Sequence, residues 1–246
     1  MSPITAFLLP FHALPRLFAP DLRRFVLVPL ALNVLVFIAL AWVGVHYFDQ
    51  LVQVWLPEDA WWSFLRWLVW PMFVLAYVLL LFYGFTIIGN LLAAPFNAVL
   101  ATHAEKARTG EFPKCAELSV ARAVGGAVTG ELQKLWYLLA RALPLLLLNG
   151  IALVILPLLL PLTSLLWILF GFWFLAVEYG DFPMGNHDLR PGDQISRLRR
   201  KRLQSLAFGA GVTVLMLVPF VQLLAIPAAV VGATRFWVDS LASADG

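Results

Sequence analysis

Residues 142–177 read ALPLLLLNGIALVILPLLLPLTSLLWILFGFWFLAV, a run of 36 residues that contains no Asp, Glu, Lys or Arg. A helix that crosses the bilayer needs only about 20 apolar residues, so this run is too long for one span. Pro157 and Pro161 divide it into arms of 15 and 16 residues, each about 22–24 Å long as a helix. Two interpretations follow: one kinked span with an overhang, or a helical hairpin that enters and leaves on the same side.

Three further uncharged runs occur in the chain, at residues 25–48, 67–102 and 203–234. The first has the length of one span and predicts a transmembrane helix over residues 20–48. The second predicts a transmembrane helix over 67–94, ended by Pro95, because proline removes a helical hydrogen bond. Pro219 lies near the middle of the last run, so the same two interpretations apply to 203–234, and we predict a second helical hairpin there.

The composition places the chain among integral membrane proteins. Its 246 residues are 62% hydrophobic and 13% charged, with a mean hydropathy of +0.87, whereas soluble domains are about 45–50% apolar and about 25% charged. The single Cys115 excludes a disulfide scaffold and a zinc site made of cysteines. A net charge of +3 is too small to indicate a nucleic-acid partner. We predict an all-α membrane protein.

The placement of the basic residues decides between the two interpretations of the 142–177 run. The 49–66 segment holds one basic and three acidic residues, whereas segments 103–141 and 178–202 hold six basic residues each. Basic segments remain on the cytoplasmic side, so the run begins and ends on the same side. The sequence therefore favours a hairpin that penetrates the bilayer only partly. Over 203–234 the charge placement supports a hairpin less strongly, because only Arg235 follows that run closely.

The remaining segments predict amphipathic helices on the cytoplasmic side. Residues 1–19 carry apolar residues at helical spacing, which predicts a helix in the membrane interface. Further amphipathic helices are predicted over 96–141. There Glu131, Lys134 and Arg141 fall within about 80° of one another around the helix. Such a charged stripe faces either water or a polar conduit through the membrane, and the pattern leaves both open.

Two asparagines lie beside the predicted break at Pro95. Asn97 can cap the next helix, and Asn90 lies one turn before the break. Transporters use broken helices near membrane depth as substrate sites, because the break frees backbone polar groups. A plain helix terminus with caps explains the same residues.

Arg23 and Arg24 stand at the start of the first predicted transmembrane helix, just after Pro20 and Asp21. Backbone N–H groups at a helix N-terminus attract anions, and guanidinium groups donate bidentate hydrogen bonds to oxyanions. These residues therefore predict an anion site, with ordinary cytoplasmic flanking charge as the alternative interpretation.

The order and spacing of several short motifs resemble the CysZ sulfate permease family, from about residue 15 to residue 239. The motifs are Leu22-Arg-Arg-Phe25 with Pro29 and Asn33, Ala93-Ala-Pro-Phe-Asn97, Glu131-Leu-Gln-Lys134 with Trp136 and Arg141, Asp181-Phe-Pro183 with Asn186 and His187, and Gly232-Ala-Thr234 with Trp237 and Asp239. The resemblance implies two long transmembrane helices and two partly penetrating, re-entrant helical hairpins.

The resemblance also implies where sulfate is handled. It implies a sulfate site at Leu22, Arg23 and Arg24, and a polar pathway that draws on Glu131, Lys134 and Arg141, with Asn90 and Asn97 beside it. It implies a bacterial inner-membrane, multi-pass protein that imports sulfate for cysteine synthesis.

We therefore expect a homo-oligomeric sulfate permease that contacts membrane lipid and is not an enzyme. The sequence contains no phosphate-binding loop, no catalytic motif and no His spacing for a metal, so we expect neither a cofactor nor a metal. The alternative is a non-transporting membrane scaffold that inserts partial hairpins into one leaflet.

Overall fold

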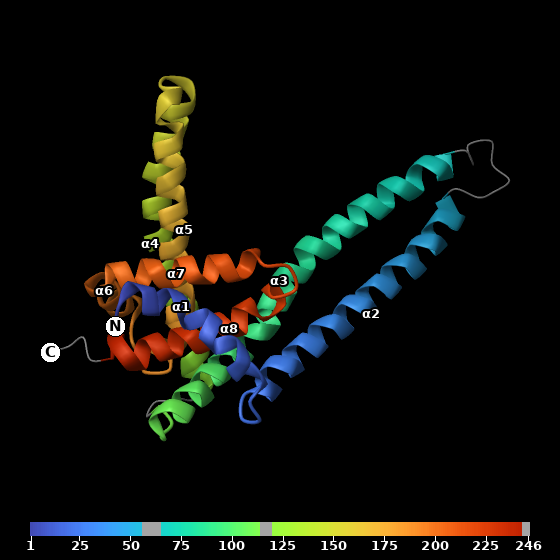
Figure 1. Ribbon diagram of the computed structural model, residues 1–246. Helices are drawn as coiled ribbons and strands as arrows, with labels where there is room; N and C mark the ends of the chain where they lie inside the picture. The colour runs from blue at the N-terminus through green and yellow to red at the C-terminus, as the bar shows by residue number, and fades with distance from the viewer. Residues whose placement is uncertain (56–64, 114–119, 243–246) are drawn as a thin grey trace. The chain divides into compact units, whose positions relative to one another are not determined.

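The computed structural model describes residues 1–55, 65–113 and 120–242. The described chain is helical and divides into two compact units, Met1–Arg23 with Asn97–Gly246, and Arg24–Phe96. Its elements, several of them labelled in Figure 1, are α1 (Pro3–Ala13), η1 (Leu14–Phe18), α2 (Arg23–Trp55), α3 (Leu65–Thr109), α4 (Val120–Val154), η2 (Pro157–Leu159), α5 (Leu160–Gly185), α6 (Pro191–Arg200), α7 (Arg202–Leu217), α8 (Gln222–Phe236) and η3 (Trp237–Leu241).

The unit of residues 24–96 is built from α2 and the first part of α3. The Tyr77 hydroxyl donates a hydrogen bond to the carbonyl of Leu40, which joins the first third of α3 to the middle of α2. Gly44 lies against the Tyr77 ring, where a Cβ atom would overlap the ring. A residue without a side chain is needed there for the ring to pack on the α2 backbone.

The predicted helix break at Pro95 is wrong. Helix α3 runs without interruption from Leu65 to Thr109, through both Pro71 and Pro95. A proline removes one backbone donor and bends a helix, but in membrane helices neighbouring groups satisfy the freed carbonyl. The predicted cap at Asn97 is wrong for the same reason, since Asn97 lies inside α3.

A glycine marks the end of α3. The helix ends where Gly110 adopts a φ of 86°, and the Gly110 amide donates to the Lys106 carbonyl over 2.8 Å. A residue in this left-handed conformation commonly closes a helix.

Helices α1, α7 and α8 form the core of the other unit. In Figure 1, α1 lies across α7 and α8. Its Ala6 and Leu9 are completely or almost completely buried, as are Phe208 of α7 and Phe236 of α8. The face of α1 that holds Ala6 and Leu9 is therefore covered by protein, whereas Ile4 and Leu8 remain exposed. The position of helix α1 in the membrane interface is still a prediction.

Two glycines of α7 allow its close approach to other backbones. A Cβ atom on Gly209 would lie 1.8 Å from the carbonyl oxygen of Phe172 in α5, and one on Gly211 would lie 2.1 Å from that of Phe7 in α1. Both distances are far below van der Waals contact. Glycine is therefore required at each crossing.

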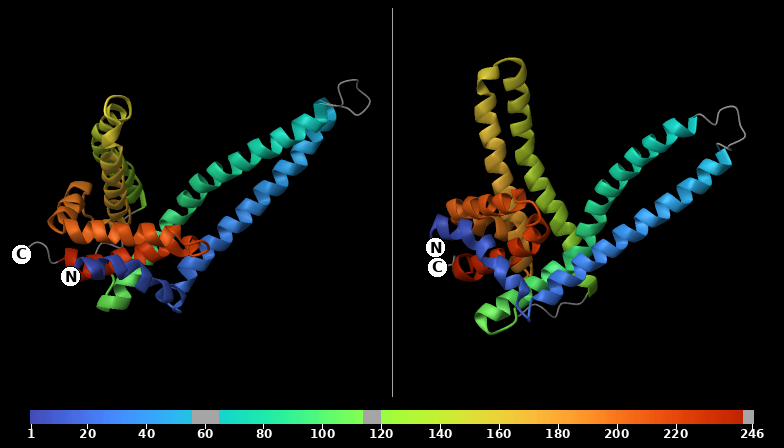
Figure 2. Two further views of the ribbon diagram at one scale, coloured as in Figure 1. Left: turned by 45° about the horizontal axis from the view of Figure 1, so that its top comes forward. Right: turned by 45° about the vertical axis from the view of Figure 1, so that its right-hand side comes forward.

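Residues 142–177 form a helical hairpin, so the interpretation as one kinked span is wrong. Helices α4 and α5 run side by side and are joined at η2 (Figure 2), and the Thr163 hydroxyl of α5 donates to Asn149 Oδ1 of α4 over 2.9 Å. Pro157 lies at the turn, whereas Pro161 occupies the first turn of α5, a favourable position for proline.

The arms of this hairpin are longer than the uncharged run alone predicted. The apolar spans reach Leu132–Val154 and Pro157–Gly185, which are 23 and 29 residues, because both helices continue through the charged residues that flank the run. Each arm is long enough to cross a bilayer. The partial penetration of this hairpin stays a prediction.

The 203–234 run also forms a hairpin, with α7 and α8 joined at residues 218–221. Phe220 at this turn adopts a φ of 64°. Helix α7 has only 16 residues, about 24 Å, which is shorter than a bilayer core. Among the described residues, four segments are long and apolar enough to cross a membrane, one each in α2, α4, α5 and α8–η3.

Cysteine labelling measures how deeply the α4–α5 hairpin penetrates. In a Cys115→Ser background, we expect Glu111→Cys and Ser196→Cys to react with a membrane-impermeant maleimide from the same face, because both belong to basic segments. Both residues are exposed. Leu158→Cys, at the tip, is expected to react from neither face. Reaction of the tip from the opposite face would show that both arms cross the membrane.

Candidate anion-binding site

The first turn of α2 carries the two arginines that the sequence singled out. Arg23 and Arg24 are both exposed, whereas the Leu22 side chain is 2% exposed. The amides of Leu22 and Arg23 donate to the Ala19 carbonyl over 3.0 and 2.9 Å. These two backbone donors are therefore engaged within the turn, and the two guanidinium groups are exposed donors beside it.

Lys134 lies between two carboxylates. Its Nζ is 3.0 Å from Asp181 Oδ2 and 3.6 Å from Glu178 Oε2, and only 6% of its side chain is exposed. A buried ammonium group requires such partners to offset its lost hydration. Lys134 therefore joins α4 to α5 and has its charge neutralised. The side chains of Glu131 and Asn90 lie outside the described part of the structure.

A second polar cluster joins the end of α5 to the last turns of α3. His187 Nε2 lies 2.7 Å from Glu105 Oε1, and Asn186 Nδ2 donates to the Ala98 carbonyl over 3.1 Å. Asn97 is buried at 7% exposure in the same part of α3. The residues Asn186 and His187 of the sequence motif therefore hold the end of α5 against α3.

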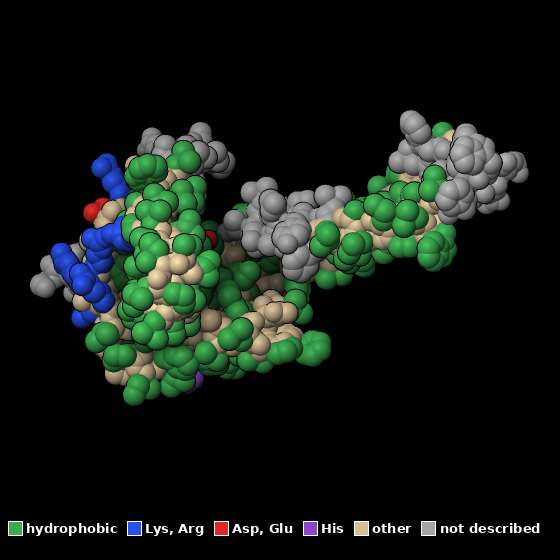
Figure 3. Space-filling model, turned by 90° about the horizontal axis from the view of Figure 1, so that it is seen from above, with side chains coloured by type: hydrophobic (Ala, Val, Ile, Leu, Met, Phe, Trp, Pro, Cys, Tyr) green, Lys and Arg blue, Asp and Glu red, His purple; other side chains and the backbone are tan. Residues whose placement is uncertain are grey.

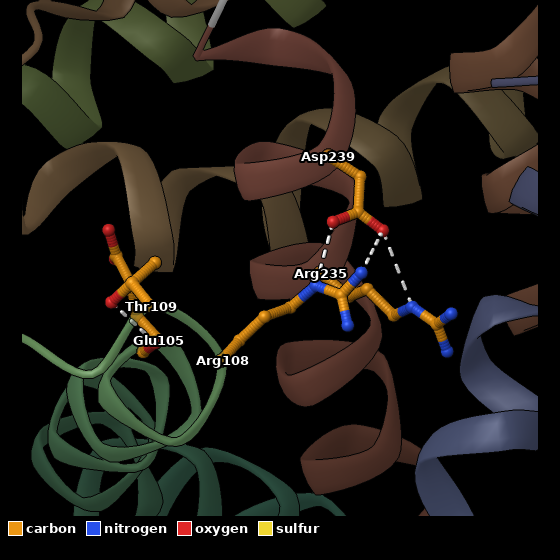
Figure 4. A network of polar contacts seen from close by, with 5 residues as sticks. All are labelled: Glu105, Arg108, Thr109, Arg235 and Asp239. Atoms are coloured by element: carbon orange, nitrogen blue, oxygen red, sulfur yellow. Dashed lines mark hydrogen bonds and ion pairs between the residues drawn. The ribbon is translucent and has the colours of Figure 1, made fainter.

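Arg108 and Arg235 share one carboxylate, that of Asp239 (Figure 4). Arg108 Nε and Nη2 donate to Asp239 Oδ1 and Oδ2 over 2.7 and 2.8 Å, and Arg235 Nε donates to Oδ2 over 3.4 Å. The bidentate geometry is the strongest form of this contact. Sequence reasoning assigned no role to these residues, although Asp239 belongs to one of the motifs quoted above.

Arg141 has a different environment, an open pocket of about 470 Å³. The pocket is lined by Tyr137, Arg141, Leu145, Phe170, Trp173, Arg199, Arg202 and Leu206. The carbon atom Cζ of Arg141 lies 3.6 Å from the centre of the Tyr137 ring. Three of the eight lining residues are therefore arginines, gathered from α4, α6 and α7.

The predicted charged stripe on α4 is thus divided in two by the fold. Lys134 is paired with α5 carboxylates, while Arg141 lines a pocket with two more arginines. Within the described residues, none of these three arginines forms an ion pair, and no group of three His, Cys, Asp or Glu residues could hold a metal ion.

Comparison with known proteins identifies the family. The family described as "Sulfate transporter CysZ/Etoposide-induced protein 2.4" matches residues 9–227. The chain is similar to proteins named "Sulfate transporter CysZ" from Pseudomonas fluorescens (39% identity, 89% of this chain and 87% of the relative), Pseudomonas syringae pv. tomato (39%, 92% and 89%) and Pectobacterium atrosepticum (40%, 89% and 79%). The chain therefore belongs to the Sulfate transporter CysZ/Etoposide-induced protein 2.4 family.

Proposed function

We propose that this protein is a sulfate permease of the bacterial inner membrane, which imports sulfate for assimilation and cysteine synthesis. The observation that carries the proposal is the similarity over 89% or more of the chain to proteins named sulfate transporters. Four segments of the described chain have the length and hydropathy of membrane spans. A non-transporting scaffold has no comparable support.

The chemistry of sulfate explains why arginines matter in such a protein. A divalent oxyanion is strongly hydrated, so a pathway has to replace its water with hydrogen-bond donors and still release it. Guanidinium groups supply several donors at once and keep their charge. Arg23 and Arg24, exposed on the first turn of α2, fit the first contact with the anion.

The interior of the pathway is proposed to draw on polar residues of α3 and α4. These residues are Asn90, Asn97, Glu131, Lys134 and Arg141. Neutralisation of Lys134 by Asp181 and Glu178 would keep the anion from being held too tightly there, because a weak site releases its ion. We propose that the protein is a homo-oligomer, works without an enzymatic reaction and needs no cofactor.

Sulfate flux into liposomes tests the proposal. The purified protein, reconstituted as the only protein, is expected to take up radiolabelled sulfate faster than protein-free liposomes, and excess unlabelled sulfate is expected to suppress the uptake. The matched control is the same chain with Arg23→Ala and Arg24→Ala, inserted to the same density. Uptake equal to that of protein-free liposomes, from protein that remains folded and inserted, would contradict transport.

A further inference from the structure

Of the residues around the pocket at Tyr137, only Arg141 has a role in the function proposed above. It is formed by α4, α5, α6 and α7 of a single unit, and we call it the Tyr137 pocket. We propose that the Tyr137 pocket is a second oxyanion-binding site, which takes a tetrahedral oxyanion: the phosphate of an anionic phospholipid headgroup or a free sulfate ion. The sulfate alternative rests on the proposed function, whereas the phospholipid alternative does not.

The charge balance distinguishes this pocket from the other basic clusters. Arg108 and Arg235 share Asp239, and Lys134 has Asp181 and Glu178. Arg141, Arg199 and Arg202 form no ion pair among the residues that the structure describes. Three like charges beside one pocket repel one another, and an anion between them removes that repulsion.

The Tyr137 ring holds two of the arginines in place. The Cζ atom of Arg141 lies 3.6 Å from the ring centre and that of Arg199 lies 5.6 Å from it. Both distances are typical of a guanidinium group over an aromatic face. The ring is fixed in turn, because Trp173 Nε1 donates to the Tyr137 hydroxyl over 3.2 Å.

Most of the donors of Arg141 remain available to a ligand. Its Nη1 donates to the Tyr137 carbonyl over 3.2 Å, which uses one of the five N–H groups of a guanidinium. The remaining donors lie in a plane that matches the oxygens of a phosphate or sulfate group. The pocket is therefore arranged for a bidentate contact before any ligand binds.

Two arginines of the pocket border the uncharged runs of the sequence. Arg141 is the last charged residue before the uncharged run 142–177, and Arg202 is the last before the run 203–234. Basic residues directly beside membrane helices contact anionic headgroups. On the face drawn in Figure 3, Lys and Arg side chains gather next to hydrophobic side chains.

The lining of the pocket also suits an amphiphile. Leu145, Phe170 and Leu206 form its apolar part, and the neighbouring Leu146 of α4 is 58% exposed. A phospholipid could place its phosphate against the arginines and its glycerol and first methylene groups along these side chains, which removes apolar surface from water. A free sulfate ion would use the arginines alone.

Binding measurements on the purified full chain in detergent test the site. One arm titrates dioctanoyl-phosphatidylglycerol, with dioctanoyl-phosphatidylcholine as the zwitterionic reference. The other arm titrates sodium sulfate, with sodium chloride at equal ionic strength, in an Arg23→Ala/Arg24→Ala background that removes the proposed first site. Arg202→Gln and Arg199→Gln are compared with Arg190→Gln, which removes the same charge from an exposed residue at the start of α6 that does not line the pocket.

Each pocket variant is expected to weaken oxyanion binding by about 10-fold or more, because it removes charge-assisted hydrogen bonds. Arg190→Gln is expected to change binding less than about twofold, because Arg190 is exposed like Arg199 and Arg202 but does not line the pocket. A loss confined to phosphatidylglycerol identifies the lipid phosphate as the ligand, and a loss confined to sulfate identifies the free ion. Equal binding by pocket variants and control in both arms would overturn the proposal.

Two further variants keep the test decisive. If a glutamine variant fails to fold, Arg202→Lys retains the charge without the planar fork and is expected to show a smaller loss of affinity. Tyr137→Phe keeps the ring under Arg141 but removes the bond to Trp173, and is expected to weaken binding less than Arg202→Gln. Failure of the sulfate-flux experiment leaves this site untouched, because binding in detergent does not depend on transport.

Discussion

Arg24→Ala is expected to weaken sulfate binding by about 10- to 150-fold. The estimate assumes that sulfate loses one charge-assisted hydrogen bond worth about 1.5–3 kcal/mol, with about 1.4 kcal/mol for each factor of ten. We expect the Arg24 guanidinium to supply this contact, since the neighbouring amides of Leu22 and Arg23 already donate to the Ala19 carbonyl. Equilibrium dialysis of the purified protein with radiolabelled sulfate measures the change.

The lysine variants separate sulfate binding from the control of topology. Lysine keeps the charge but loses the planar fork of donors, so Arg23→Lys and Arg24→Lys should insert normally and bind sulfate less well than the parent chain. The positive-inside rule counts lysine and arginine equally. Wild-type affinity in the double lysine variant, with correct orientation shown by cysteine labelling, would remove these residues from the binding site.

Gly211→Ala is expected to lower the free energy of unfolding by at least about 1–3 kcal/mol, the usual penalty for overpacking. The new Cβ would lie 2.1 Å from the Phe7 carbonyl oxygen, and in Gly209→Ala it would lie 1.8 Å from that of Phe172. No rotamer change relieves either overlap, since both partners are backbone atoms. For a chain of this length the loss corresponds to a fall in Tm of about 2–12 °C.

Two other glycines provide matched controls for this prediction. A Cβ atom at Gly150 or Gly171 would have no other atom within 4 Å, and both residues lie inside helices, α4 and α5. Alanine favours a helix over glycine by about 1 kcal/mol, so Gly150→Ala and Gly171→Ala should leave Tm unchanged or slightly higher. A Gly211→Ala chain as stable as Gly171→Ala would contradict the close packing of α1 on α7.

Proline positions were the weakest guide to the helices. Pro157 and Pro219 mark real turns, whereas Pro71 and Pro95 lie inside α3. From the local sequence one can infer only that a proline removes a backbone N–H donor and adds a ring. Whether the helix stops or continues depends on which groups nearby satisfy the freed carbonyl, and those groups come from distant parts of the chain.

Hydropathy and charge placement, by contrast, determined the architecture of the helices from the sequence alone. Burial of apolar residues in a bilayer is additive along a segment, so the lengths of the uncharged runs and the basic segments between them indicated an all-α membrane protein with a hairpin at 142–177. The structure shows that hairpin as α4 and α5.

Only the tertiary structure decided which basic residues remain available to an anion. Lys134 and Arg141 both belong to the charged stripe on α4, but Lys134 pairs with Asp181, 47 residues away in the sequence. In the same way, Arg108 of α3 pairs with Asp239, 131 residues away. Arg141 instead meets Arg199 and Arg202 around Tyr137. A charge pattern gives the sign and the helical face of each residue, whereas ion pairing depends on distances of a few ångströms between helices. Those distances arise when α4, α5, α6 and α7 pack together.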